Sequence, residues 1–223
     1  VHRASFWEEP SIDELAAAAP IVIGPQGKSI AYVARTKDST VVIVDGSPRG
    51  SYAYAGLPMF SHDGSRLAYV AGDADMRFVV LDGQEGPRYD RIDSVLFSPD
   101  GRRVAVGRYD GMIFLWGGSV GWRHVVQEVS RRLASKETLK FTGHGGAITG
   151  LSFSPDGQRL ASSSLDGTIK LWKTSEGREI LTLRGHTNGV TAVAFSPDGH
   201  RLAAGGQDGA IIIWDGAPIK AGS

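Results

Sequence analysis

Two short stretches carry residues of the kinds that catalyse hydrolysis or bind phosphate. The run Gly117-Gly118-Ser119-Val120-Gly121 matches the Gly-x-Ser-x-Gly elbow that presents a nucleophilic serine, and His124 follows it closely. The run Gly24-Pro25-Gln26-Gly27-Lys28-Ser29 is close to a phosphate-binding loop, although Val22 occupies the position of that loop's first glycine. Whether either stretch does this chemistry depends on the elements that contain it.

A repeated unit organises the second half of the chain. It begins Phe-Ser-Pro-Asp-Gly at Phe97, Phe153 and Phe195, and in every copy an Asp follows the Phe by thirteen residues and a Trp follows it by nineteen. Weaker copies begin at Ile23 and Phe60, so the five starts are separated by 37, 37, 56 and 42 residues. A period near 40 with strand-like content is typical of a β-propeller, in which each repeat forms one four-stranded sheet.

Residue types divide each copy into strands. In the fourth copy, apolar and small residues over 148–153, 160–163, 168–172 and 180–183 are separated by Ser-Pro-Asp-Gly and Asp-Gly turns. The sequence therefore predicts an all-β fold, a propeller of about five four-stranded antiparallel blades over 20–223. The blades start near residues 20, 57, 93, 147 and 189. Five copies also allow a fragment of a larger propeller.

The segment 1–19 does not repeat. Ser11 and Glu14 form a capping box before a predicted short helix over about 12–18, and 4–7 has the composition of a strand. The fifth blade lacks an outer strand, so 4–7 could fill that position and close a five-bladed ring. Alternatively, further blades or a second chain complete the ring.

The interval of 56 residues contains an insertion. Its excess of 14 over the next interval falls between the third and fourth strands of the third blade. Apolar residues there follow a helical spacing and predict an amphipathic helix over about 121–134: Trp122, Val125, Val126, Val129 and Leu133. Its apolar stripe packs on the propeller or, alternatively, docks a partner.

The stretch from about 97 to 215 resembles WD-repeat propellers. The features that carry the resemblance are Gly143-His144 and Gly185-His186, the turn residues Asp110, Asp166 and Asp208, and the closing residues Trp116, Trp172 and Trp214. The resemblance implies that a His, a Ser or Thr, the turn Asp and the Trp form a hydrogen-bonded network inside each blade.

The three blades hold this implied network to different extents. The fourth blade has all members: His144, Ser162, Asp166 and Trp172. The fifth has Ala204 where the hydroxyl belongs, and the third has Val106 there and no Gly-His. Because a missing member leaves its partners under-satisfied, we expect the fourth blade to be the most tightly ordered and the third the loosest.

The first half, about 20–90, is similar to the repeats of TolB-like bacterial propellers. Its blades close with Val44-Asp45-Gly46 and Leu81-Asp82-Gly83 instead of a Trp, and they recur at 37 residues. Asp73 keeps the turn position. This mixture indicates a bacterial propeller of heterogeneous origin or part of a longer one.

The repeat register gives both enzyme-like stretches a structural explanation. Gly27 aligns with the turn glycines of the other copies, and the Gly-x-Ser-x-Gly run follows a blade strand where the insertion begins. A hydrolase of that type needs parallel strands with crossover helices, which the pattern lacks. We therefore predict that the chain is not an enzyme and holds no cofactor or metal.

Composition narrows the partners. The 24 basic and 24 acidic residues balance, so the sequence offers no basic field for nucleic acid, and no apolar run is long enough for membrane insertion. The chain has no Cys, which excludes disulfides and Cys-ligated zinc. A cytoplasmic location is favoured, and a periplasmic one stays open.

The predicted function is a non-catalytic scaffold that binds a protein or peptide. The resemblance implies docking on the face that carries the Gly-His loops and Asp turns. Tyr109 is the strongest candidate there because exposed aromatic residues often dominate binding. The alternatives are an accessory propeller of a hydrolase, peptidase or kinase, and a propeller that binds a small ligand or carbohydrate. The candidate binding residues are Arg108, Tyr109, Leu165, Asn188 and Gln207.

Overall fold

The computed structural model describes residues 20–117 and 138–216. Within them the chain forms five antiparallel sheets, and the short 3-10 turn η2 (Pro25–Gly27) is the one helical element. The expected all-β architecture with about five sheets is confirmed. The predictions for 1–19, for Ser119 and His124 and for the helix over 121–134 lie outside the described residues.

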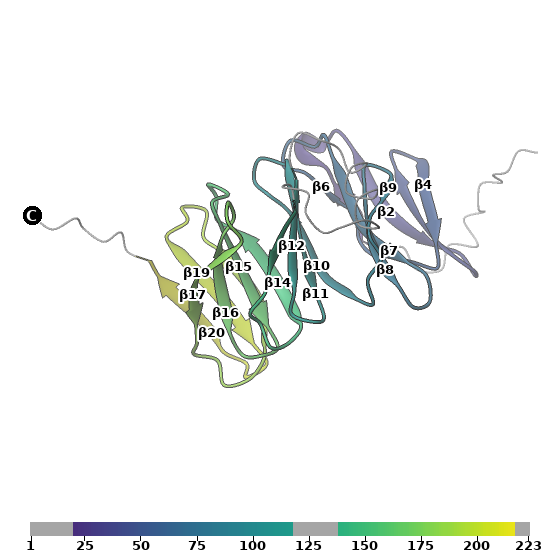
Figure 1. Ribbon diagram of the computed structural model, residues 1–223. Coiled ribbons are helices and arrows are strands. Elements are labelled where there is room, and N and C mark those ends of the chain that lie inside the picture. The colour runs from purple at the N-terminus through teal and green to yellow at the C-terminus, as the bar shows by residue number, and fades with distance from the viewer. Residues whose placement is uncertain (1–19, 118–137, 217–223) are drawn as a thin grey trace, which may run out of the picture.

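We number the sheets one to five in chain order (Figure 1). Sheet one contains β1 (Val22–Ile23), β2 (Ile30–Arg35), β3 (Thr40–Val44) and β4 (Ser47–Tyr52). Sheet two contains β5 (Tyr54–Ala55), β6 (Met59–Phe60), β7 (Leu67–Gly72), β8 (Arg77–Leu81) and β9 (Gln84–Glu85), and both β5 and β6 pair with β7. In sheet one β3 ends at the hairpin turn Asp45-Gly46, and in sheet two β8 ends at the hairpin turn Asp82-Gly83.

The other three sheets follow the stronger copies of the repeat. Sheet three contains β10 (Ile92–Phe97), β11 (Arg103–Arg108), β12 (Ile113–Gly117) and β13 (Thr138–Phe141). Sheet four contains β14 (Ile148–Phe153), β15 (Arg159–Ser164), β16 (Ile169–Lys173) and β17 (Arg178–Leu183). Sheet five contains β18 (Val190–Phe195), β19 (Arg201–Gly206) and β20 (Ile211–Asp215), so in the described residues it has three strands.

Turn chemistry sets the register of the first two strands in each sheet. Gly157 closes the Ser-Pro-Asp-Gly turn of sheet four with φ 67°, and Gly27 adopts the same φ in sheet one. This left-handed conformation favours glycine, so Gly27 is a hairpin-turn residue in this structure and its neighbours form no phosphate-binding loop before a helix. Ser154 fixes the turn because its Oγ accepts a hydrogen bond from the Arg159 amide at 2.9 Å.

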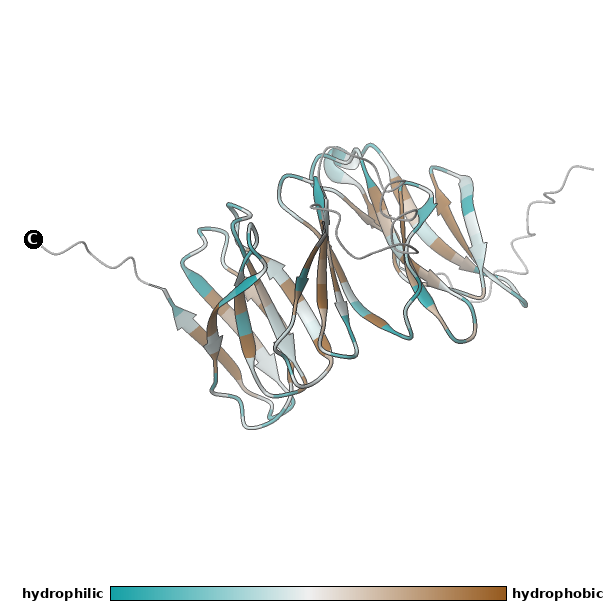
Figure 2. Ribbon diagram, in the orientation of Figure 1, coloured by the Kyte–Doolittle hydropathy of each residue, from teal (hydrophilic) through white to brown (hydrophobic). Residues whose placement is uncertain are grey.

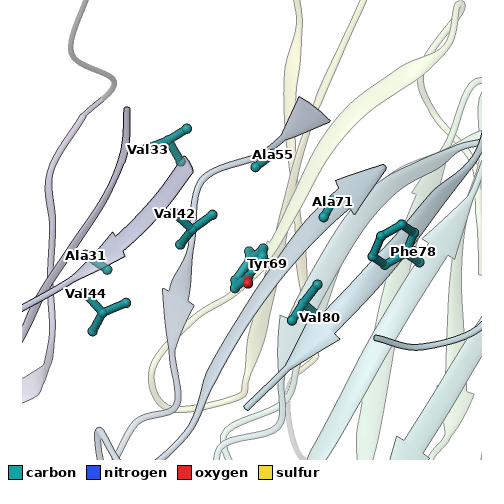
Figure 3. Packing of buried hydrophobic residues seen from close by; sticks show 9 residues of the cluster. All are labelled: Ala31, Val33, Val42, Val44, Ala55, Tyr69, Ala71, Phe78 and Val80. Atoms are coloured by element: carbon teal, nitrogen blue, oxygen red, sulfur yellow. The ribbon is translucent and has the colours of Figure 1, made fainter. Parts of the chain in front are cut away.

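The core lies between neighbouring sheets. Hydrophobic residues gather along the strands, whereas the turns at their ends are hydrophilic (Figure 2). Figure 3 shows the first interface, where Val42 and Val44 of β3 face Tyr69 and Val80 of sheet two. Because both faces of an inner sheet are covered in this way, inner strands carry apolar residues on both sides.

The sheets follow one another so that sheet one and sheet five lie at opposite ends of the molecule (Figure 1). The described residues therefore form an open row of sheets, and each turn edge of the row presents a line of loops. One edge carries the Ser-Pro-Asp-Gly turns together with the turns at Asp45 and Asp82, and the other carries the Gly-His loops and the turns at Asp110, Asp166 and Asp208. We call this second edge the Asp-turn edge.

Candidate functional site

A continuous hydrogen-bonded network supports the Asp-turn edge in sheet four. His144 contacts the Asp166 Oδ2 through Nδ1 at 2.9 Å and the Ser162 Oγ through Nε2 at 2.8 Å. The indole Nε1 of Trp172 donates to the same Ser162 Oγ at 2.8 Å. Since the Asp166 carboxylate can only accept, the proton of the neutral imidazole resides on Nδ1, and Nε2 accepts the proton of the serine hydroxyl. All four side chains that the sequence assigned to this network are brought together.

Charge in this network is held on the aspartate. Burial lowers the pKa of His144 below its ordinary value, and the hydrogen bond to Asp166 opposes this shift only in part. Burial alone would raise the pKa of Asp166, but hydrogen bonds from Thr168, Gly145 and His144 outweigh it and lower that pKa to about 2. At neutral pH the pair is therefore a neutral imidazole and a carboxylate.

Sheet five has a shortened version of the network. His186 Nδ1 lies 3.0 Å from the Asp208 Oδ1, and its Nε2 lies 3.3 Å from the Ala204 carbonyl oxygen. Trp214 contacts the imidazole edge-on, with the ring centroids 6.3 Å apart. The backbone amide of Thr187 is the main cause that lowers the pKa of Asp208 to about 2. The His and Asp are brought together, but the hydroxyl that would join them to the tryptophan is absent.

Sheet three uses a different arrangement, which the sequence did not reveal. Arg108 Nη2 pairs with Asp110 Oδ2 at 2.6 Å, and its guanidinium lies 4.5 Å from the centroid of Tyr89. Tyr89, Phe114 and Trp116 stack on one another at centroid distances of 5.8 to 6.3 Å. In sheet three the turn aspartate is thus bound by an arginine that lies on an aromatic stack, whereas in sheets four and five it is bound by a histidine.

Arg108 is therefore less accessible than its position next to a turn suggested. Its side chain is 19% exposed, forms an ion pair with Asp110 and packs on the aromatic stack. The neighbouring Tyr109 is 57% exposed, and the Arg91 guanidinium lies 5.1 Å from its ring centroid. Arg91 was not among the predicted binding residues, because its approach to Tyr109 joins two different strand ends.

Three of the predicted binding residues converge on Gly189. Leu165 is 44% exposed, and Asn188 and Gln207 are also exposed. The backbone N–H of Gln207 donates to the Gly189 carbonyl oxygen at 2.8 Å. A Cβ built on Gly189 would lie 2.9 Å from the Gln207 Oε1 and 3.0 Å from the Leu165 Cδ2. The three side chains therefore form one small surface across sheets four and five.

Close backbone packing joins the loops of this edge. A Cβ on Gly111 would lie 2.7 Å from the His144 carbonyl oxygen, and a Cβ on Gly146 would lie 3.0 Å from the Asp166 amide nitrogen. The turn of sheet three thus abuts the loop before sheet four, which in turn abuts the turn of sheet four. From sheet three to sheet five the Asp-turn edge is a single continuous ridge.

The opposite edge holds a shallow cavity of about 530 Å³. Its lining includes Arg103 and Arg159, and both arginines donate hydrogen bonds to turn carbonyl oxygens, of Gly157 and Gly199. Across residues 20–117 and 138–216, no three His, Asp or Glu side chains are grouped to hold a metal ion. The same residues include no helix of the length and apolarity that a membrane span requires.

Comparison with known families identifies three matches to the WD domain, G-beta repeat, over residues 79–117, 135–173 and 177–215. Together they cover just over half of the chain. The second and third matches each begin just before an outer strand, β13 or β17, and end in the third strand of the next sheet, β16 or β20. Residues 20–78 lie outside the matches.

Several characterised proteins are similar over part of the chain. The serine-threonine kinase receptor-associated protein of Dictyostelium discoideum is 44% identical over 64 residues, which are 29% of this chain and 20% of that protein. The vegetative incompatibility protein HET-E-1 of Podospora anserina is 43% identical over 58 residues, 26% of this chain and 4% of that protein. Human striatin-4 is 61% identical over 33 residues, 15% of this chain and 4% of that protein. The chain thus spans a fifth or less of each relative's length. Since these relatives are eukaryotic, they lend no support to a TolB-like or bacterial origin.

Proposed function

This chain belongs to the WD-repeat family, and from that premise we propose that it is a non-catalytic scaffold that binds a protein or peptide along its Asp-turn edge. The observation that carries the proposal is the convergence of Leu165, Asn188 and Gln207 on Gly189, on a ridge whose loops are packed backbone to backbone. Rigid supports of this kind reduce the entropy that binding must overcome, because the loops are ordered beforehand.

The chemistry of the ridge suits a peptide. Leu165 supplies an exposed apolar side chain, while Asn188 and Gln207 supply amides that can donate and accept hydrogen bonds. Tyr109 adds an exposed aromatic ring at the sheet-three end, and Arg91 beside it adds a positive charge. An apolar or aromatic anchor with adaptable polar neighbours is a common composition of binding hot spots.

The named relatives support a binding role. One of them is described as a protein associated with serine-threonine kinase receptors, which states an association and no catalytic step. The polar groups beneath the ridge are also occupied. His144 binds both Asp166 and Ser162, and the Trp172 indole donates to the serine oxygen. This His-Ser-Asp set therefore differs from a catalytic triad, in which the serine oxygen faces substrate. We therefore propose no enzymatic activity for this set.

Affinity capture with paired variants tests the proposal. Immobilised chain, wild type or carrying Tyr109→Ala, Leu165→Ala or Gln207→Ala, is offered a cell extract, and bound proteins are quantified by mass spectrometry. Gln158→Ala and Arg102→Ala are matched controls, because these exposed polar residues lie in the turns at the opposite edge of the same sheets.

The proposal predicts a set of proteins that is retained by the controls and lost, by at least several-fold, with the ridge variants. Thermal unfolding of each variant separates lost binding from lost folding. Capture that is unchanged by all three ridge variants, with folding intact, would place the binding surface elsewhere and overturn the proposal.

A further inference from the structure

The proposed binding surface contains the one Asn of the chain. Asn188 precedes Gly189 in the loop before β18, and its side chain is exposed. An Asn side chain can react with the backbone nitrogen of the residue that follows it, and a following glycine leaves that nitrogen accessible because it has no Cβ. Whether this surface changes its own chemistry therefore depends on the local geometry of the pair.

The two reacting groups already lie against each other. The Gly189 N–H donates to Asn188 Oδ1 at 2.8 Å, so the side-chain amide folds back over the nitrogen that would attack it. Holding a nucleophile beside its target lowers the entropic part of a barrier. The ring that the attack closes consists of the Gly189 nitrogen and the Cγ, Cβ, Cα and backbone carbonyl carbon of Asn188.

The Asp-Gly turns beside this loop are held differently. The backbone N–H groups of Gly167 and Gly209 each donate to a backbone carbonyl oxygen three residues earlier, at 3.2 and 3.1 Å. The side chains before them, Asp166 and Asp208, are carboxylates, which a nitrogen nucleophile attacks far less readily than an amide. The reactive arrangement is therefore a property of the Asn-Gly pair and not of every turn on the Asp-turn edge.

We infer that Asn188 is a site of spontaneous deamidation in the folded protein. The Gly189 nitrogen loses its proton to hydroxide and forms a bond to Asn188 Cγ. The bond between Cγ and Nδ2 then breaks, and the amino group takes a proton from water and leaves as ammonia. Water opens the cyclic imide that remains, so the net change consumes one water and replaces an amide with a carboxylate.

Packing around the loop favours one of the two products. Water that adds to Cγ leaves Asp at position 188, whereas water that adds to the backbone carbonyl carbon leaves an isoaspartate, whose main chain runs through the side chain. The Asn188 carbonyl oxygen lies against sheet four, 3.4 Å from a Cβ built on Gly167, and the Gln207 N–H holds the Gly189 carbonyl oxygen. An isoaspartate would lengthen the main chain just before Gly189, so the folded chain favours Asp.

The product alters the proposed binding surface. Asn188 can donate and accept hydrogen bonds beside Leu165 and Gln207, whereas a carboxylate there only accepts them and must lose its hydration when a partner binds. This consequence rests on the proposed function: conversion should lower the capture of partners, so the surface loses affinity as the protein ages.

Peptide masses in aged protein test the modification. Folded wild-type protein and a synthetic peptide of residues 185–201 are kept side by side at mildly alkaline pH. Trypsin cleavage after Arg184 and Arg201 then releases the same peptide from the protein. It contains Asn188 and no Gln, and Asp198 can isomerise only without a change of mass, so a gain in mass reports Asn188 alone. Unaged protein digested in parallel gives the baseline.

The folded protein should convert at a rate within a few-fold of the peptide and yield a larger share of Asp over isoaspartate. Asn188→Gln is the control, because its longer side chain closes a less favourable ring and should keep its amide. Folded protein that keeps the amide after the peptide has lost most of it would overturn the inference. A product ratio equal to that of the peptide would overturn the role assigned to the Gly167 and Gln207 contacts.

Capture from cell extract tests the consequence separately. Aged wild type and fresh Asn188→Asp should each retain several-fold less of the partners than fresh wild type, whereas aged and fresh Asn188→Gln should capture equally. Undiminished capture by Asn188→Asp would overturn the loss of affinity. Fresh wild type that captures nothing would contradict the proposed function, while the peptide masses still decide the deamidation.

Discussion

The indole nitrogen of Trp172 lies 2.8 Å from the hydroxyl oxygen of Ser162, and at the equivalent place in sheet five Ala204 presents only a methyl group to the side of Trp214. This difference decides whether the tryptophan is joined to the Asp turn. In sheet four the hydroxyl joins the tryptophan to His144 and so to the Asp turn. In sheet five the chain of hydrogen bonds from the Asp turn ends at His186, whose Nε2 approaches a backbone carbonyl oxygen.

Exchanging the two residues measures how much that hydroxyl contributes to the free energy of unfolding. Ser162→Ala should lower the free energy of unfolding by about 1–3 kcal/mol, because it leaves the buried Trp172 indole and the His144 Nε2 without a partner. Ala204→Ser should raise it by about 0.5–1.5 kcal/mol by supplying the missing link. Urea denaturation of both variants gives the two values. A Ser162→Ala variant as stable as wild type would contradict the assigned network. A destabilising Ala204→Ser would show that sheet five cannot accommodate the hydroxyl.

Removing the turn aspartates should reveal the same asymmetry. Asp166 accepts hydrogen bonds from His144, from the Gly145 amide and from Thr168, and Asp208 accepts a similar set from His186, Thr187 and Ala210. The direct losses in Asp166→Ala and Asp208→Ala are thus comparable. Only in sheet four does the released histidine also free a serine and a tryptophan. We expect the melting temperature to fall more for Asp166→Ala, and equal falls would contradict this.

The buried histidine predicts how stability depends on pH. Because the folded-state pKa of His144 is lowered, the unfolded chain takes up a proton near the ordinary value of about 6.5 while the folded chain stays neutral. Its contribution is therefore complete above that pH and is lost as the pH falls below it. The charged groups that face the ring are Asp166, Lys170 and Glu179.

His144→Gln isolates this contribution. The free energy of unfolding of the wild type should decline between pH 7 and pH 5 more steeply than that of the variant, which lacks the titrating group at this site. Chemical denaturation at a series of pH values checks it. Parallel curves would show that His144 is not the neutral, buried group described above.

Repetition explains how much of this fold could be predicted from the sequence. The offsets between Phe153, Asp166 and Trp172 recur in three copies, and together with turn residues they located the strands of sheets three to five. The resemblance to WD-repeat propellers, and not the offsets, assigned His144 to the Asp turn. Local pattern is sufficient there, because each contact lies within one repeat unit or between a loop and its own sheet.

Contacts between different repeats were not predictable in the same way. Arg108 replaces a histidine only because Tyr89 and Phe114 provide a stack on which its guanidinium lies. An arginine recurs in the sequence six positions after the leading Phe of a repeat, and Arg66, Arg103 and Arg159 each lie over the leading Phe of the next repeat, a contact that we call the arginine clasp. Their role depends on the distance to the following sheet, which a pattern does not give.

The clasp has a measurable effect on stability. Arg103→Met keeps most of the apolar stem but removes the hydrogen bond to Gly157 and the approach to Phe153. It should cost about 1–2 kcal/mol. Arg201→Met is the matched control, because the Arg201 side chain is 64% exposed, so the same change there should stay within about 0.5 kcal/mol. Equal effects would show that the contact with the next sheet contributes nothing.

The first junction lacks the clasp, and this permits a gain of stability by design. Ser29 stands six residues after Ile23, where the later copies have arginine, and the turn it would reach contains Gly64 and follows Phe60. The two turns already lie close together, since a Cβ built on Gly64 would be 3.4 Å from Pro25, just as one on Gly199 would be 3.2 Å from Pro155. Ser29→Arg should therefore complete a fourth clasp and raise the free energy of unfolding by about 0.5–1 kcal/mol.

Ser29→Met, which adds length without the donor, is the control. Hydrogen exchange should show slower opening of β2 and β3 in the arginine variant alone, and equal protection in both variants would mean that added apolar contact, and not the clasp, holds this junction.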